Sequence, residues 1–331
     1  MHFESRRILA VVAGLSCLGL SACQPKPKAA PSGAKRYKVG FANLQEDMPF
    51  AVRVREGIQK AAKDAGNIDL ICADNRLDGK VAMDNANNFI TQQVDGVIEF
   101  QTDAEFGKEI MRKFNEAHIP VIAIDIPMPG ATFFGVNNYP AGHMAGANLG
   151  NWIKANWGGK VDNLVMLELP QSGKVPAERL RGEREGLESV VGKFAEPNVV
   201  HLDSKNTLET ARALVADTLT RLPNAHHIAV VCINDDTALG AINAAEAAGR
   251  KNDIAVCAVD ASDRGREEIR KPGSPHKGST ASFPEKYGEH IIPVLLQGMQ
   301  GKKMPESFYT THIVMTKDNV DKYYPNDKKQ G

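Results

Sequence analysis

The sequence predicts an α/β fold with two doubly wound lobes, each a parallel sheet covered by helices on both faces, joined by three hinge crossovers. Three observations support this prediction. Short apolar runs alternate with helical stretches from residue 37 onward, and this alternation is typical of parallel sheets. The pattern restarts after a long helical stretch at Tyr139–Trp157. The chain has 331 residues, which is long for one hydrophobic core and sufficient for two.

The first strand, loop and helix of this pattern lie between Tyr37 and Gly66. An apolar strand ends at Ala42, a polar loop follows, and Pro49 begins a helix, because its fixed φ angle suits the first helical turn. Ligands of open α/β sheets bind beside the carboxyl ends of strands. We therefore expect the loop at 43–48 to contribute to the functional site.

The other elements follow in order, and each run between strands is long enough for a crossover helix. Further strands are expected at Ile68–Ala73, Gly96–Phe100, Pro120–Asp125, Thr132–Val136, Asn163–Leu167, Asn198–Leu202, His227–Ile233, Ile254–Val259 and Gly278–Phe283. Further helices are expected at Gly79–Gln93, Ala104–Ala117, Arg179–Val191, Thr207–Arg221, Thr237–Ala248 and Arg264–Arg270.

The last part of the chain is expected to return to the first lobe. A helix at Pro284–Gln300 and a strand at Ser307–Val314 would complete the first sheet, and the following segment would cross back. The first lobe would then comprise residues 37–138 and 283–310, and the second residues 139–282 and 311–325. The crossovers would lie near Asn138, Ser282 and Thr310.

The long helix carries Gly142, Gly146 and Gly150 at four-residue spacing. This stripe indicates close packing of the helix against the sheet rather than a phosphate site. The sequence has neither a GxGxxG motif after a strand nor a GxxxxGK[ST] motif, which are the usual signals of nucleotide binding. No cofactor is expected.

The N-terminus has the features of a targeting segment. Arg6 and Arg7 precede an apolar stretch at 8–20, which is too short to span a bilayer, and Leu20-Ser21-Ala22-Cys23 resembles the bacterial lipobox. We expect residues 1–22 to be a signal peptide and 23–36 a flexible tether lipidated at Cys23. The protein would then be exported, to the periplasm or to the outer face of the cell membrane. The lipid anchor would be its only attachment to the membrane.

Composition excludes some functions. The 40 lysine and arginine residues balance 40 aspartate and glutamate residues, so no net charge attracts nucleic acid or acidic membranes. No Cys/His set has metal-ligand spacing. Cys72, Cys232 and Cys257 lie in apolar runs and are interpreted as buried free thiols. A disulfide between Cys232 and Cys257 stays open as an alternative.

Polar side chains gather just after the predicted strands, and Phe50 lies at the start of the first helix. In the first lobe they are Asn43, Gln45, Glu46, Asp47, Asn75, Arg76, Thr102, Asp103 and Asp125. In the second they are Gln171, Ser172, Asn234, Asp235, Asp236, Asp260, Ser262, Asp263 and Ser282, with Arg179 beginning a helix. Carboxylates accept hydrogen bonds from neighbouring hydroxyls, amides and guanidinium donate, and a ring covers an apolar C–H face. This set suits a polyhydroxylated solute.

Several motifs in this order resemble the type I periplasmic solute-binding proteins of ABC transporters, above all the ribose- and galactose-type sugar binders. They are Asn43…Pro49-Phe50, Gly57, Asn87–Ile98, Ile119–Asp125, Val136-Asn137-Asn138, Arg179-Leu180-Arg181-Gly182, Asn234-Asp235…Ala238–Ala241 and Ala258-Val259-Asp260. The resemblance covers residues 37–317 and implies two lobes that close on a small ligand and dock on a permease. By position it implies ligand hydrogen bonds from Asp125, Arg179, Asn234 and Asp260. It also implies stacking by Phe50 and a first-loop contact from Asn43 or Gln45.

The sequence departs from the ribose-type pattern at several of these positions. In the ribose-type pattern an arginine directly follows the aspartate that corresponds to Asp125, but this chain has Ile126 there. The pattern also has a glutamine where this chain has Ser282. Aromatic residues expected near Ala51, Lys205-Asn206 and Val259 are absent. Ribose itself is therefore not expected, and a more polar or differently shaped solute, with Glu46, Asp47 or Lys205 contacting its extra groups, is an open hypothesis.

Three functions are compatible with a two-lobed chain of this kind. The leading hypothesis is a monomeric, non-catalytic binding protein that delivers a monosaccharide or related polyol to an ABC permease and its ATPase. The alternative is a sensor lipoprotein that presents a sugar or an autoinducer-2-like signal to a chemoreceptor or histidine kinase. An enzyme is not expected, because GxSxG, HExxH and Cys/His nucleophile patterns are absent. Asp235 is interpreted as the cap of a helix that begins at Thr237.

Overall fold

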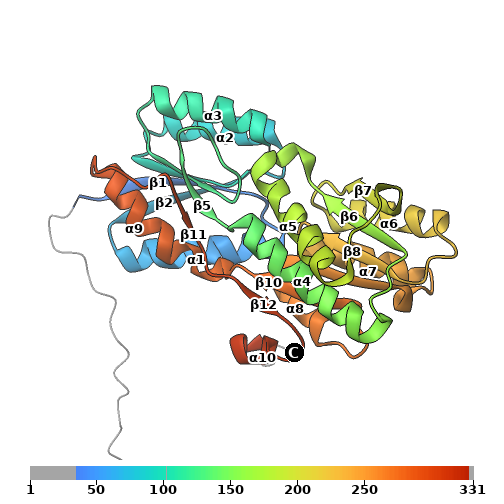
Figure 1. Cartoon of the computed structure of the whole chain (residues 1–331). Helices are drawn as coiled ribbons and strands as arrows, with labels where there is room; N and C mark the ends of the chain where they lie inside the picture. Colours follow the sequence, from blue (N-terminus) through green and yellow to red (C-terminus); the bar gives the residue numbers. More distant parts are fainter. Residues whose placement is uncertain (1–34, 102, 328–331) are drawn as a thin grey trace, which may run out of the picture.

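The computed structural model describes residues 35–101 and 103–327, which form two lobes side by side (Figure 1). The predicted signal peptide, Cys23 and the tether as far as residue 34 lie outside the described residues. Lys35 and Arg36 precede the first strand and form exposed ion pairs with Asp95 and Asp69. Within the described ranges, no helix has the length and apolar character needed to span a bilayer.

The first lobe contains a six-stranded parallel sheet in the order β11-β5-β4-β3-β1-β2. Its strands are β1 (Tyr37–Asn43), β2 (Ile68–Asp74), β3 (Gly96–Glu99), β4 (Val121–Ile124), β5 (Thr132–Gly135) and β11 (Ser307–Tyr309). Every residue of β3, β4 and β5 is buried. Continuous burial is expected of parallel strands that are covered on both faces.

Helices cover both faces of this sheet (Figure 1). Helices α1 (Pro49–Ala65) and α9 (Tyr287–Met299) share one apolar cluster with strand residues such as Ile98. Helices α2 (Gly79–Thr91) and α3 (Ala104–Glu116) share another with strand residues such as Val97. Because neighbouring side chains of a strand point to opposite faces, Val97 and Ile98 belong to different clusters.

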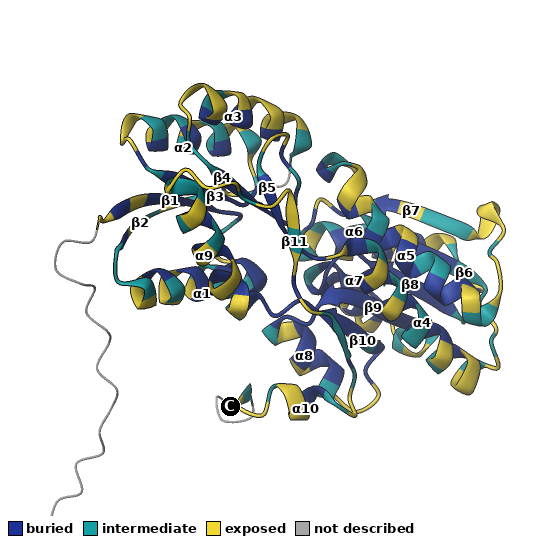
Figure 2. Cartoon of the chain, turned by 60° about the vertical axis from the view of Figure 1, so that its left-hand side comes forward, coloured by how far each residue is buried: buried dark blue, intermediate teal, exposed yellow. Residues whose placement is uncertain are grey.

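The second lobe contains a six-stranded sheet in the order β12-β10-β9-β8-β6-β7. Its strands are β6 (Asn163–Glu168), β7 (Val199–Asp203), β8 (Ile228–Cys232), β9 (Ile254–Asp260), β10 (His276–Ala281) and β12 (Ile313–Met315). Only β12 runs antiparallel, against β10. Apart from β12, the strands of both sheets are parallel, so the predicted fold class is confirmed. Figure 2 shows buried strands between helices whose outer faces are exposed.

The second sheet is also covered on both faces. Its helices are α4 (Asn138–Trp157), α5 (Lys174–Val191), α6 (Leu208–Arg221), α7 (Asp235–Ala247) and α8 (Asp263–Arg270). Helices α4 and α5 contribute to one apolar cluster, and α6 and α7 to another. Short 3-10 helices occur at Pro170–Ser172, Glu196–Asn198, Lys251–Asp253 and Pro284–Lys286, and a last helix, α10, at Val320–Tyr323.

The glycine stripe of α4 faces another helix. A Cβ atom at Gly142 would lie 2.0 Å from the Arg179 carbonyl oxygen of α5, and one at Gly146 would lie 1.9 Å from that of Glu183. Gly150 of α4 faces Val190 of α5. The prediction of close helix–sheet packing was therefore wrong in its partner, because the stripe allows two helix backbones to meet.

The chain passes between the two sheets three times, after β5, after β10 and after β11. The single strand predicted at Ser307–Val314 was wrong: it is two strands, β11 and β12, because a segment that passes between separate sheets cannot pair with both. The Thr310 hydroxyl donates to the Ser282 carbonyl (2.6 Å), and the Asn137 N–H donates to His312 Nε2 (3.0 Å). These bonds tie the passing segments together.

Three local predictions are corrected. Helix α5 begins at Lys174, so Arg179 lies in its second turn instead of at its start. Asn234, not Asp235, caps α7, since its side chain accepts the Thr237 N–H at 3.0 Å. Cys72 is exposed, because β2 is an edge strand. Cys232 and Cys257 are buried free thiols, as predicted, and do not form the disulfide left open.

Candidate functional site

A small cavity of about 50 Å³ lies between the lobes, at the carboxyl ends of strands from both sheets. Its described lining consists of Leu44, Met48, Phe50, Phe100, Asp125, Ile126, Leu169, Pro176, Arg179, Asn206, Ile233, Asn234 and Asp260. Five residues predicted for the site are among them: Phe50, Asp125, Arg179, Asn234 and Asp260. They meet because the strand ends of two sheets face the same gap.

Asp125 follows β4 and has a positive φ of 57°, a conformation that aspartate tolerates better than most residues. Its Oδ1 accepts the Val136 N–H at 2.9 Å, which ties it to the first crossing segment, and the Tyr287 hydroxyl lies 3.4 Å from Oδ2. The neighbouring Gly135 leaves room for it, because a Cβ there would lie 2.2 Å from Oδ1. Burial raises the pKa of Asp125, and the charge of Arg179 opposes this shift.

Arg179 reaches from α5 into the cavity. Its Nε donates to Asn138 Oδ1 (3.0 Å) and its Nη1 to the Ile233 carbonyl (2.6 Å). The same Nη1 lies 3.8 Å from Asp260 Oδ1, at the end of β9. Burial raises the pKa of Asp260 well above its usual value, and Arg179 opposes the shift. The guanidinium therefore lies beside Asp260, with its direction fixed by a side chain and a carbonyl.

Asn234 and Asn206 form a buried amide pair. Asn234 Nδ2 donates to Asn206 Oδ1 at 2.7 Å, while its own Oδ1 caps α7. Asn206 has a positive φ of 62°, which turns it toward the cavity after β7. The pair leaves amide N–H groups that can donate to a ligand.

Phe50 belongs to the first turn of α1 and makes edge contacts with two rings. Its centroid lies 6.2 Å from that of Phe100 and 5.9 Å from that of Tyr287. These contacts fix the ring where one of its faces can cover the C–H face of a ligand. The predicted role of Phe50 is therefore compatible with its position.

Three residues predicted for the site do not line this cavity. Asn43 is buried, and its amide donates to Glu46 Oε1 (3.0 Å) and the Ala51 carbonyl (3.2 Å). Gln45 donates to Asp47. Ser282 lies in the second crossing segment, where its carbonyl accepts from Thr310. The Asn43 and Gln45 side chains bond within or beside the first-lobe loop, whereas Ser282 bonds through its backbone carbonyl, and the proposed ligand contacts of all three stay predictions.

Gln45 instead lines a neighbouring interlobe pocket of about 230 Å³, together with Asp47, Asp236, Arg264 and residues 206–209. Burial raises the pKa of Asp236 to about 6, and Arg264 opposes the shift. Glu46 pairs with Arg55, and Lys205 with Asp203. Glu46 and Lys205 do not line the cavity, and Asp47 lines only the neighbouring pocket. The hypothesis of a more polar solute therefore has little support.

Sequence reasoning missed the apolar part of the lining. Leu44 and Met48 lie in the loop that was expected to be polar, and Phe100, Leu169 and Ile233 directly follow β3, β6 and β8. Asn206 was noted only for the absence of an aromatic residue. Position directly after a strand was the available signal for Leu44, Phe100, Leu169 and Ile233, whereas Asn206 lies in the loop between β7 and α6 and Met48 lies just before α1.

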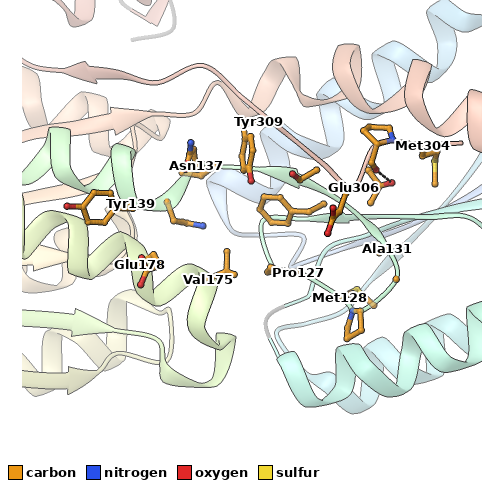
Figure 3. Close-up of a pocket in the computed structure, with 18 residues that line it drawn as sticks. Pro127, Met128, Ala131, Asn137, Tyr139, Val175, Glu178, Met304, Glu306 and Tyr309 are labelled. Atoms are coloured by element: carbon orange, nitrogen blue, oxygen red, sulfur yellow. Dashed lines mark hydrogen bonds between the residues drawn. The ribbon is translucent and has the colours of Figure 1, made fainter.

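A larger pocket of about 870 Å³ lies on the flank of the lobe junction (Figure 3). Met304, Glu306 and Tyr309 border it from the segment around β11, and Val175 and Glu178 from α5. Its charged groups are the two glutamates, of which Glu178 pairs with Arg181. None of the residues predicted for the site lines it, and we assign it no ligand.

The cavity can bind through hydrogen bonds and stacking. Asp235 accepts the Ser262 N–H (2.5 Å) and lies 3.2 Å from His276 Nε2, so it connects the loop after β9 with β10. Over residues 35–101 and 103–327, no group of three or more His, Cys, Asp or Glu side chains could hold a metal ion.

Two similar α/β lobes with a cavity between them, lined by both polar and apolar side chains, define a two-lobed solute-binding protein. The chain belongs to the periplasmic binding protein domain family, whose model matches residues 39–303. The resemblance predicted from sequence motifs is thus confirmed. This family consists of the non-enzymatic substrate-binding proteins of transporters.

Individual relatives are distant but cover almost the whole chain. It is 26% identical to the xylitol-binding protein of Mycolicibacterium smegmatis, over 97% of this chain and 88% of the relative. It is 25% identical to the ribose import binding protein RbsB of Bacillus subtilis, over 91% and 96%. Its fold matches an ABC transporter solute-binding protein from Agrobacterium vitis with bound allitol (TM-score 0.76, 21% identity, coverage 88% and 99%).

Proposed function

We propose that this chain is an exported binding protein that captures a monosaccharide or related polyol between its lobes and delivers it to an ABC permease with its ATPase. Lipidation at Cys23 would hold it on the outer face of the membrane, and it would act as a monomer. The relatives support the class of ligand, since their names include binding proteins for xylitol and ribose.

The observation behind this proposal is the convergence of hydrogen-bonding groups in one cavity. Asp125 and Asp260 can accept from hydroxyls, Arg179 and the amides of Asn206 and Asn234 can donate, and Phe50 can cover a C–H face. Hydrogen bonds to charged groups contribute about 1.5–3 kcal/mol each. A few such bonds offset the entropy lost when a small ligand is enclosed.

Closure around the ligand is supported by contacts between the lobes. Arg53 of α1 donates through Nε to Asp263 Oδ2 of α8 at 2.8 Å, outside the cavity. Such a contact forms only when the lobes are together. A ligand shifts the lobes toward this state by as much as its affinity for the closed form exceeds that for the open form, and a permease would recognise the closed pair.

The test is calorimetric titration of the purified protein with pentoses, hexoses and polyols, preceded by a thermal-shift screen. We expect at least one sugar or polyol to bind, and Asp125→Ala to weaken it at least tenfold with the fold intact by circular dichroism. Asp125→Asn is the matched variant, because its amide oxygen can still accept the Val136 N–H. Absence of binding across the panel, or unchanged affinity in Asp125→Ala, would contradict the proposal.

The anchor is tested separately with Cys23→Ser, a change of one atom at the predicted lipidation site. We expect the wild-type protein in the membrane fraction of expressing bacteria and the variant in the soluble or unprocessed fraction. Cys72→Ser, at an exposed thiol of the folded lobe, is the control. Equal membrane fractions for Cys23→Ser and wild type would exclude lipid anchoring without affecting the proposed ligand.

A further inference from the structure

The two lobes contribute unequally to the cavity. Among the described lining residues, the first lobe supplies one polar side chain, Asp125, and the second supplies four, Arg179, Asn206, Asn234 and Asp260. The rest of the first-lobe lining is apolar, and Leu44, Met48, Phe50 and Phe100 belong to one hydrophobic cluster. We call these four residues the apolar wall.

Three carbonyl groups of the apolar wall already accept hydrogen bonds within the first lobe. The Leu44 carbonyl accepts the Leu77 N–H at 3.0 Å, and the Met48 carbonyl accepts the Val52 N–H at 3.0 Å. The Phe100 carbonyl accepts Asn75 Nδ2 at 2.9 Å. These oxygens are already occupied within the first lobe.

The polar side chains of the adjoining loop do not line the cavity, and several of them bond elsewhere in the first lobe. The Asn43 amide donates to the Ala51 carbonyl and to Glu46, Glu46 pairs with Arg55, and Gln45 donates to Asp47. Among the residues that line the cavity, the apolar wall therefore offers no polar side chain to a ligand hydroxyl placed against it. A buried hydroxyl without a partner weakens binding, whereas a methyl or methylene group gains from burial at the same place.

Resting on the function proposed above, we propose that the ligand is a deoxy sugar or deoxy polyol. Its hydroxyl edge lies against Asp125, Arg179, Asn234 and Asp260. Its methyl or methylene group lies against the apolar wall. This assignment replaces the more polar solute considered from the sequence, since the groups invoked for that solute do not line the cavity.

The test uses matched pairs that differ by one hydroxyl: 2-deoxy-D-ribose and D-ribose, 5-deoxy-D-ribose and D-ribose, L-fucose and L-galactose, L-rhamnose and L-mannose. Each is titrated calorimetrically into the purified full chain. In at least one pair, we expect the deoxy member to bind about tenfold more tightly or better, the size expected for one hydroxyl left unpaired on burial.

A variant tests whether the preference for the deoxy member arises at the apolar wall. Met48→Gln keeps the length of the side chain and adds an amide, so it should reduce the preference for the deoxy member severalfold by offering the hydroxyl a partner. Met144→Gln, the same change at an exposed position of α4, should leave the preference unchanged. Equal preference in Met48→Gln and wild type would contradict the role of the wall.

The outcomes separate this inference from the function on which it rests. If only fully hydroxylated sugars or polyols bind, or if they bind as tightly as their deoxy partners in every pair, the inference is wrong and the proposed function stands. If no sugar or polyol of any kind binds, both are wrong.

Discussion

The walls of the cavity differ although the lobes share a fold. The second lobe presents a guanidinium, a carboxylate and two amides, while the first presents the apolar wall and Asp125. Hydrogen bonds depend on direction, but apolar burial depends mainly on the area removed from water. The second lobe can therefore set the orientation of a ligand, and the first can enclose whatever apolar surface is left.

This difference suggests an order of events. The polar groups of the second lobe are held by their own lobe or its crossing segment: Arg179 by Asn138 and Ile233, and Asn234 through the cap of α7. They need no contribution from the first lobe to keep their positions. A ligand could thus bind to the second lobe of an open molecule and be covered by the first. Three predictions test this division of roles.

The largest effect is expected among the polar groups that the second lobe contributes to the cavity. Arg179→Ala should weaken ligand binding about 100-fold, because it removes charged hydrogen bonds that contribute about 1.5–3 kcal/mol each. It also removes the positive charge that opposes the raised pKa of Asp260. Calorimetric titration with the best ligand of the panel measures the effect, and circular dichroism checks the fold.

Two further variants complete this comparison. Phe50→Leu, at the apolar wall, should cost only about fivefold, since ring contacts add about 0.5–1.5 kcal/mol beyond area burial. Arg181→Ala on the exposed side of α5 should leave affinity unchanged, because its ion pairs with Glu178 and Glu185 are exposed and such pairs contribute little. A larger loss in Phe50→Leu than in Arg179→Ala would reverse the roles of the two walls.

A smaller effect is expected at the bridge between the lobes. Arg53→Gln removes the contact with Asp263, and both partners are about one-third exposed. Exposed pairs contribute about 0–1 kcal/mol, so affinity should fall about threefold at low salt through a smaller closed fraction. Salt screens such pairs, and the difference from wild type should shrink in titrations at high salt.

Lys60→Gln is the matched control for Arg53→Gln. Its partner Asp64 lies on the same helix, so the pair does not span the lobes and its loss should leave affinity unchanged at any salt concentration. If Arg53→Gln loses affinity equally at low and high salt, the effect does not arise from this ion pair. The bridge would then have no part in closure.

Much of this architecture was predictable from the sequence. The strands were placed to within a few residues because apolar runs end in polar loops, and Asp125, Asn234 and Asp260 were placed at the cavity because parallel strands end at one edge. Asn43 also follows the apolar run of β1, yet its amide turns to the Ala51 carbonyl. Which way a loop side chain turns depends on nearby backbone groups that need partners, and sequence order alone does not supply this.

The apolar wall is a second feature that sequence order alone did not predict. The loop at 43–48 contains mostly polar residues, so the sequence indicated a polar first-lobe contribution. In the structure its polar groups bond within the loop and with Arg55. Leu44 and Met48 are left to line the cavity. A polar sequence can thus present an apolar surface when its polar groups satisfy one another.

The last prediction concerns Glu99, which ends β3 in the first lobe but is not among the residues that line the cavity. It is buried, accepts Asn75 Nδ2 at 2.8 Å and has no arginine or lysine partner within the described chain. Burial raises the pKa of Glu99 to about 8. Between its usual pKa and this value, the folded protein binds a proton that the unfolded chain releases, so stability should fall as pH rises.

Glu99→Gln removes this titration while keeping the size of the side chain. The slope of unfolding free energy against pH between 5 and 7.5 should become less negative by up to about 1.4 kcal/mol per pH unit, and ligand affinity should not change. Urea unfolding at several pH values measures the slope. Glu105→Gln, at an exposed position of α3, should leave it unaltered. An unchanged slope in Glu99→Gln would mean that Glu99 is ionised in the folded lobe. A loss of ligand affinity would instead mean that the first lobe contributes a second carboxylate to the site, and the contrast between the two walls would be smaller than the lining indicates.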